Sequence, residues 1–302
     1  VHSHGTWGTI GAAAATARLL SFDTANTLKA MNLAMSMSPA NTWTPCLEGA
    51  TIRNLYPGRS SYQGILAAHL CRCGFTGVED GPADLYNSIL GEEFDPEAVV
   101  HGLGKRGNYR IQQNYFKFHA CCLYNHPVLD AVQTLERQEE FTASDIDHIQ
   151  VVVPTIATTM NNPEPANMLA AKFSIPYAVA AALTRGTTDV TSFYPEQVGS
   201  PDILDLAQRV EVNADPDMNL RRFDYPAARV TVRLNDGRSL EQSVTVQHGD
   251  AKYPASHDEL LAKFRLLAGP SLNEDRMQQV IDTVDRMDEL EDIRELTALL
   301  GS

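Results

Sequence analysis

The sequence is poor in basic residues and has no long apolar run. Lys and Arg number 24 against 38 Asp and Glu, so the formal net charge is −14. Nucleic-acid binding needs a concentrated basic face, and this charge therefore argues against that class of partner. No apolar run reaches the roughly 20 residues that cross a bilayer, and no secretory signal pattern is present. These absences predict a cytoplasmic protein with no nucleic-acid and no membrane partner.

Cysteines are also few and irregularly placed. There are five, an odd number, at positions 46, 71, 73, 121 and 122. This pattern does not suggest a disulfide framework and fits a reducing compartment. It matches no zinc or iron–sulfur spacing, so we expect no metal site and interpret most of these thiols as small buried apolar groups.

The 302 residues are enough for a sizeable core in one or two domains. The chain opens on "VHSHGTWGTIGAAAATARLL". Its glycines permit close backbone approach, and the alanines start a helix over about residues 9–20. His2 and His4 stand just ahead of that helix, where the exposed N–H groups favour an anion. Two interpretations of this stretch remain. It is either an anion site with an imidazole beside it or a frayed terminus with two solvated histidines.

The order of the expected elements is helices, then a mixed segment, then helices. Gly74 ends a helix, "NYRIQQNYFKFHACC" has strand-like composition, and Asn235-Asp236-Gly237 predicts a hairpin. Ser256 and Glu259 form a capping box that begins the C-terminal helices. We predict a mostly α fold with an α+β insertion. A helical domain would cover 1–107 and 254–302 and an α+β lid domain 108–253, with a small-molecule cleft between them.

Several stretches together resemble the MmgE/PrpD family, and they cover nearly the whole chain. They are "HSHGTWGTIGAAAATARLL", "EGATIRNLYPGRSSYQGILAAHLCRCGFTG", "YFKFHACCLYNHPVLDAV", "AKFSIPYAVAAAL" and "LLAKFRLLAG". The resemblance implies a homodimer of helical and lid domains with no metal or organic cofactor. It also implies a further helical segment, with an active-site acid, ahead of the first histidine motif. We therefore expect this chain to be a fragment, a truncated product or one half of a split protein.

The family acts on small polycarboxylates. Its known activities are dehydration of 2-methylcitrate, decarboxylation of cis-aconitate and epimerisation of iminodisuccinate. Removal of a proton next to a carboxylate needs a base and cations that stabilise the developing charge. By motif position, His2 and His126 are the proton-transfer candidates, whereas His4 is an extra histidine. Tyr56 stands where members often have His, and it could donate a proton.

The resemblance also indicates the residues that bind substrate. Arg53 stands where many members have Lys, and it could hold a carboxylate bidentately. Lys117 is a candidate carboxylate ligand, and Cys122 aligns with a position that is Cys or His. Lys172 and Ser174 would line the cleft. The alternatives are a surface cation for Arg53, a surface strand for Lys117 and a packed thiol for Cys122. We interpret His69 as a packed or surface residue, and we assign no role to His101, His119, His148, His248 and His257.

These observations predict a metal-independent lyase, with a dehydratase of a small di- or tricarboxylate as the leading hypothesis. A cis-aconitate-type decarboxylase and an iminodisuccinate-type epimerase are the alternative enzymes. A non-catalytic homologue that binds a carboxylate or only dimerises is the alternative from another class. We expect His2, Arg53, Lys117 and His126 to converge on one cleft between the two domains.

Overall fold

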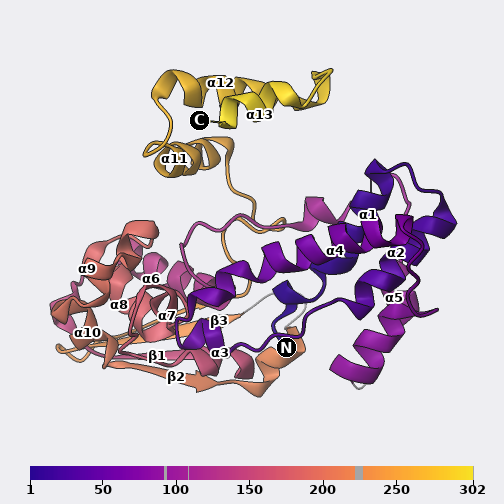
Figure 1. Ribbon diagram of the computed structural model, residues 1–302. Helices are drawn as coiled ribbons and strands as arrows, with labels where there is room; N and C mark the ends of the chain where they lie inside the picture. Colours follow the sequence, from indigo (N-terminus) through magenta and orange to yellow (C-terminus); the bar gives the residue numbers. More distant parts are fainter. Residues whose placement is uncertain (92–93, 108, 222–226, 302) are drawn as a thin grey trace.

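The computed structural model describes residues 1–91, 94–107, 109–221 and 227–301. Helices predominate, and one small sheet lies in the middle of the chain, so the mostly α fold with an α+β region is confirmed. Figure 1 shows three groups of elements: N-terminal helices, a sheet with its own helices, and three C-terminal helices. The division into a 1–107 plus 254–302 domain and a 108–253 domain stays a prediction. Among the described residues, no helix is long and apolar enough to cross a membrane.

The N-terminal group is built from three helices in close contact, α1 (Gly8–Leu19), α2 (Thr24–Ser36) and α4 (Tyr56–Arg72). The Ala-rich helix is therefore confirmed, and its Ala13 and Ala17 are fully buried. α1 and α4 approach so closely that a Cβ on Gly64 would lie 2.3 Å from the carbonyl oxygen of Thr9. Gly74 takes a left-handed φ of +87° just after α4, as the sequence predicts. Shorter elements are α3 (Thr44–Leu47), the π-helical Ala83–Leu90 and α5 (Pro96–Val100).

The sheet has the strand order β2-β1-β3-β4. Its strands are β1 (Ile146–Val153), β2 (Val210–Ala214), β3 (Ala228–Leu234) and β4 (Ser239–Val244). β1 pairs with β2 in parallel and with β3 antiparallel, and β3 pairs antiparallel with β4. The predicted hairpin at residues 235–237 is confirmed as the β3–β4 turn, in which Gly237 has a φ of +93°.

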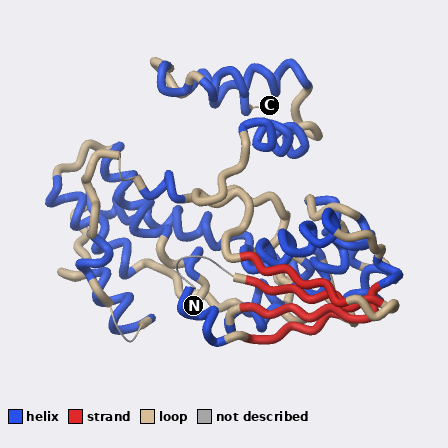
Figure 2. The backbone as a smooth tube through the Cα atoms, turned by 180° about the vertical axis from the view of Figure 1, so that it is seen from behind, coloured by secondary structure: helices blue, strands red, loops and turns tan. Residues whose placement is uncertain are grey.

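Helices cover one face of this sheet, and the main core lies between the two layers (Figures 1 and 2). α6 (His126–Gln138) packs on β3 and β4, and α8 (Ile175–Arg185) packs on α6 and β2. Alternate β1 residues, including Val151 and Val153, are fully buried against them. Polar pairs occupy the other face, for example His148 with Glu211 at 3.2 Å. The remaining helices of this group are α7 (Met168–Ala171), α9 (Pro195–Val198) and α10 (Pro201–Ala207).

The segment 109–122 is not a strand, so its strand-like composition was misleading; Asn108 lies outside the described residues. Its backbone N–H groups bond three separate parts of the chain instead of one neighbouring strand. Phe116 donates to Gly249, Ala120 to Thr188 and Cys122 to Lys172, each at 2.9 Å. We call residues 109–122 the crossing segment because they run between these parts. The segment begins with the 3₁₀ turn Arg110–Gln113, and its Tyr109, Ile111 and Phe116 are exposed.

The C-terminal helices α11 (His257–Ala268), α12 (Glu274–Asp285) and α13 (Arg294–Leu300) form a separate layer at the top of Figure 1. The predicted capping box is present, with Ser256 and Glu259 bonded reciprocally. α11 reaches the rest of the chain through Lys263 Nζ, 5.9 Å from the centre of the Phe118 ring, and through Glu259, 2.8 Å from His248.

Candidate active site

A small cavity gathers four of the predicted substrate-binding residues. It has a volume of 250 Å³, and Arg53, Lys117, Cys122 and Lys172 all line it, together with Cys121 and Phe173. These residues come from three parts of the fold: the turn before α4, the crossing segment, and the end of α7. None of the described residues that line the cavity is acidic. The arrangement suits a ligand with more than one negative charge.

Arg53 lies in the 3₁₀ turn Thr51–Leu55, and neutral groups hold its guanidinium. Its Nη2 lies 3.2 Å from Nδ1 of His4, and its Cζ lies 5.5 Å from the centre of the Phe173 ring. Arg53 also lies near the Cys46 thiol, whose pKa is raised by burial and partly lowered by the guanidinium. No described carboxylate forms an ion pair with Arg53, so its positive charge is not neutralised by the surrounding protein.

Two lysines add positive charge to the same cavity. Lys117 Nζ donates to the carbonyl oxygen of Cys121 at 3.1 Å, which fixes the direction of its side chain. Lys172 follows directly after α7, and burial lowers its pKa from the usual lysine value. Like Arg53, both lysines lack a carboxylate partner within the described ranges. Three cations in a small partly desolvated space can outweigh the repulsion from distant surface carboxylates, which salt screens over about 8 Å.

The thiols at this cavity are neutral at physiological pH. Burial raises the pKa of Cys122, and it raises the pKa of Cys121 to about 12. Cys122 caps the 3₁₀ turn Leu123–Asn125 just before α6, and the residue is 8 % exposed. Cys122 is therefore a buried, neutral thiol that also lines the cavity.

His2 and Tyr56 lie behind the cavity and do not line it. The His2 ring is 1 % exposed and packs on Trp43, with 4.3 Å between ring centres, and on Tyr56 at 5.5 Å. Its Nδ1 accepts the backbone N–H of His4 at 3.3 Å, so the neutral ring carries its proton on Nε2. Burial, followed by the charges of His4 and Arg53, lowers the pKa of His2 to about 4. His2 connects to the cavity through His4 and Arg53, and also through Trp43, whose ring centre lies 6.5 Å from that of the cavity-lining Phe173.

His126 is the first residue of α6 and is fully buried. Neither ring nitrogen has a hydrogen-bond partner among the described residues. The nearest rings are His119, at 5.1 Å between centres, and Tyr115 at 6.4 Å. Burial, and then the charges of His119 and Lys117, lower the pKa of His126 to about 2. His126 lies inside the protein near Lys117 but is not a cavity-lining residue.

Ser174 has a structural position at the start of α8. Its hydroxyl accepts the N–H of Tyr177 at 3.0 Å and donates to the carbonyl oxygen of Asn162 at 2.5 Å. It is fully buried and outside the cavity lining. The predicted set is therefore divided: Arg53, Lys117, Cys122 and Lys172 share one cavity, whereas His2, Tyr56, His126 and Ser174 are buried and do not line it. The chemical roles of all eight stay predictions.

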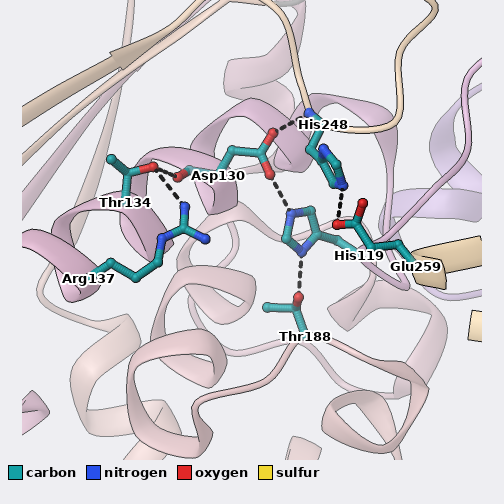
Figure 3. A network of polar contacts seen from close by, with 7 residues as sticks. All are labelled: His119, Asp130, Thr134, Arg137, Thr188, His248 and Glu259. Atoms are coloured by element: carbon teal, nitrogen blue, oxygen red, sulfur yellow. Dashed lines mark hydrogen bonds and ion pairs between the residues drawn. The ribbon is translucent and has the colours of Figure 1, made fainter. Parts of the chain in front are cut away.

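A second polar centre contains two histidines to which the sequence analysis gives no role (Figure 3). His119 Nε2 lies 2.9 Å from one carboxylate oxygen of Asp130, and its Nδ1 bonds the Thr188 hydroxyl. The other Asp130 oxygen accepts the backbone N–H of His248 at 2.7 Å, and the His248 ring bonds Glu259. These residues line a separate cavity of 410 Å³. No short sequence motif could have found a network whose members are up to 140 residues apart.

The described residues contain no group of three or more His, Cys, Asp or Glu side chains that could hold a metal ion. The Asp130 network includes two histidines and two carboxylates, but these are paired with one another in a chain (Figure 3). The expectation of a metal-independent reaction stays a prediction.

Comparison with known proteins identifies the family. The MmgE/PrpD N-terminal domain matches residues 1–87, and the MmgE/PrpD C-terminal domain matches residues 119–288. The chain is 28 % identical to a cis-aconitate decarboxylase of Homo sapiens, over 97 % of this chain and 61 % of that protein. It is 26 % identical to a cis-aconitate decarboxylase of Aspergillus terreus, over 84 % and 55 %. A cis-aconitate decarboxylase-like protein of Aspergillus oryzae, oryM, is 25 % identical, over 99 % and 65 %. The chain thus spans about three fifths of the length of these relatives, and it belongs to the MmgE/PrpD family.

Proposed function

We propose that this chain carries the substrate-binding cavity of a lyase that decarboxylates a small polycarboxylate of the cis-aconitate class. The observation that carries the proposal is the cavity lined by Arg53, Lys117 and Lys172 with no acidic side chain. The curated relatives are decarboxylases, so they favour this alternative over the dehydratase that leads the sequence analysis. Dehydration and epimerisation of similar substrates have no comparable support.

The chemistry of decarboxylation fits a site rich in cations. Loss of CO₂ breaks a carbon–carbon bond and leaves the electron pair on carbon, from which it spreads onto a neighbouring carboxylate. Cations that already face this carboxylate stabilise the added charge without reorganising. The planar fork of Arg53 suits bidentate binding of a carboxylate, whereas Lys117 acts as a point charge.

A proton must then reach the carbon atom, and Lys172 is our candidate for its donor. Its ammonium lines the cavity, and burial lowers its pKa toward neutrality, which makes it a better acid than an exposed lysine. Burial lowers the pKa values of His2 and His126, so both rings are neutral near pH 7 and are weak bases. In this scheme Lys172 regains its proton from solvent, whereas His2 and His126 act as neutral groups that orient the residues around the cavity, and Tyr56 supports His2.

The test is binding and turnover by the purified protein. Calorimetric titration with cis-aconitate, citrate and 2-methylcitrate measures affinity, and release of CO₂ measures decarboxylation. The Arg53→Ala change should weaken cis-aconitate binding by about 1.5–3 kcal/mol, the range for hydrogen bonds to charged groups. Arg59→Ala is the matched control, because Arg59 is an exposed arginine six residues further on that does not line the cavity. Lys172→Met should retain most binding and lose CO₂ release.

The outcomes separate the competing hypotheses. If none of the three acids binds to the folded protein, the polycarboxylate proposal is wrong. If 2-methylcitrate binds and loses water while cis-aconitate releases no CO₂, the dehydratase hypothesis replaces ours. Binding without any turnover would support the non-catalytic alternative.

We propose three further properties that the family resemblance implies. A homodimer predicts a mass in solution twice that of one chain, which light scattering after size exclusion measures. Activity without a cofactor predicts that dialysis against a chelator leaves turnover unchanged. Cytoplasmic location predicts that a fluorescent fusion of the protein is diffuse in its host cell.

A further inference from the structure

His4 and the aromatic ring of Phe173 both contact the guanidinium of Arg53, the arginine that binds substrate in the proposed function. It belongs to the 3₁₀ turn Ser3–Gly5, and its Nδ1 lies 3.2 Å from Nη2 of Arg53. An arginine side chain has only donors, so the histidine nitrogen must be the acceptor. The bond therefore requires a His4 ring that is unprotonated at Nδ1 and carries its proton on Nε2.

The surroundings of His4 favour this neutral form. Burial, and then the charges of Arg53 and Lys117, lower the pKa of His4 below the usual histidine value. The other titratable group facing the ring is His2, at 4.8 Å between ring centres, whereas Trp7 at 5.9 Å is uncharged. No described carboxylate pairs with His4. Protonation would remove the acceptor and place a second positive charge beside Arg53.

The remaining contacts of the guanidinium do not determine its rotation. Phe173 lies 5.5 Å from Cζ, and a ring contact of this kind tolerates rotation in the plane of the fork. The nearby Cys46 thiol can form only a weak hydrogen bond. Arg53 Nε is buried with no partner among the described residues. The bond to His4 is thus the directional contact that decides which N–H groups of Arg53 face the cavity.

We propose that His4 is a positioning residue for Arg53: its Nδ1 lone pair fixes the guanidinium so that the free edge of the fork meets a substrate carboxylate. This inference rests on the proposed function, in which Arg53 binds that carboxylate. It gives a role to the histidine that the resemblance leaves as an extra one. His4 does not line the cavity, so it acts through Arg53.

Two variants separate the lone pair of His4 from its shape. His4→Phe keeps a flat ring but has no acceptor, and His4→Asn places an amide oxygen near the position of Nδ1. Calorimetric titration with cis-aconitate should show about tenfold weaker binding for His4→Phe, the loss of one charge-assisted hydrogen bond. His4→Asn should bind within about threefold of the wild type. His4→Ala is the second acceptor-free variant if His4→Phe does not fold, which thermal melting establishes.

A double-mutant cycle distinguishes positioning from a general packing effect. In an Arg53→Ala background, His4→Phe should weaken binding no further, because the group through which it acts is gone. Full binding by His4→Phe in the wild-type background would overturn the inference. So would an equal further loss in the Arg53→Ala background, or a His4→Asn variant as weak as His4→Phe. If the wild-type protein binds none of the polycarboxylates, the proposed function fails instead, and this result is distinct from all three.

Discussion

Burial of His126 should make the protein lose stability as the pH falls. Its pKa is about 2 in the folded protein, against an ordinary value near 6.5 in the unfolded chain. Between these values the unfolded state binds a proton that the folded state does not, so the free energy of unfolding decreases with decreasing pH. The contribution is fully present above pH 6.5. Each pH unit below it costs about 1.4 kcal/mol, so going from pH 7 to pH 5 costs about 2 kcal/mol for this residue.

The variant that tests this is His126→Leu, which removes the titrating ring from a fully buried position. Urea unfolding at pH 7 and pH 5 gives the decrease in the free energy of unfolding of each protein between these pH values. The loss in His126→Leu should be about 2 kcal/mol smaller than in the wild type. His2, with a pKa of about 4, adds its own acid-dependent loss to both proteins and cancels in this difference. The control is His257→Leu, which removes an exposed histidine and should lose as much as the wild type.

An equal pH-dependent loss in His126→Leu and wild type would refute the reasoning. It would mean that the buried ring is protonated in the folded protein, or that the unfolded chain keeps it neutral. The comparison also removes the effect of the net charge of −14, whose self-repulsion changes with pH in the same way in both proteins.

Three further predictions concern stability, measured by urea unfolding. Gly64→Ala should lower the free energy of unfolding by about 1–3 kcal/mol, because its Cβ would meet the Thr9 carbonyl oxygen at 2.3 Å. Gly11→Ala, whose Cβ would have no atom within 4 Å, should instead raise the free energy of unfolding by about 0.5–1 kcal/mol. Ser174→Ala should cost about 1–2 kcal/mol through the lost cap of α8, whereas Ser200→Ala, at a helix start without a side-chain cap bond, should change stability by less than about 0.5 kcal/mol. Asp130→Ala should cost about 2–4 kcal/mol, because it leaves His119 Nε2 and the His248 N–H without their acceptor, and amide exchange at His248 should accelerate. An unchanged midpoint for any of the three would count against the contact named for it.

Elements with a local physical cause could be predicted from the sequence. The Ala-rich α1, the glycine after α4, the β3–β4 turn and the capping box of α11 each depend on residues within a few positions of one another. The crossing segment could not be predicted in this way. Its N–H groups bond Gly249, Thr188 and Lys172, which are 50 to more than 130 residues away, and composition carries no information on such partners.

The site was predictable to a similar, limited extent. The resemblance indicated Arg53, Lys117, Cys122 and Lys172, and the structure brings these four to one cavity. It gave no reason to expect that His126 would be fully buried without hydrogen-bond partners. Nor did it give His4 a role, because an acceptor for Arg53 is recognisable only when the two side chains are seen together.

The crossing segment forms a wall shared by two cavities. Lys117 and Cys122 face the cation-rich cavity, whereas Phe118 and His119 face the one beside Asp130. Because neighbouring side chains of this stretch line different cavities while the backbone is tied at Phe116, Ala120 and Cys122, the length of this stretch is fixed. Deletion or insertion of a single residue between 116 and 122 would move side chains away from the cavities that they line and would break this backbone register. Homologous chains should therefore vary in residue type along this stretch but not in its number of residues.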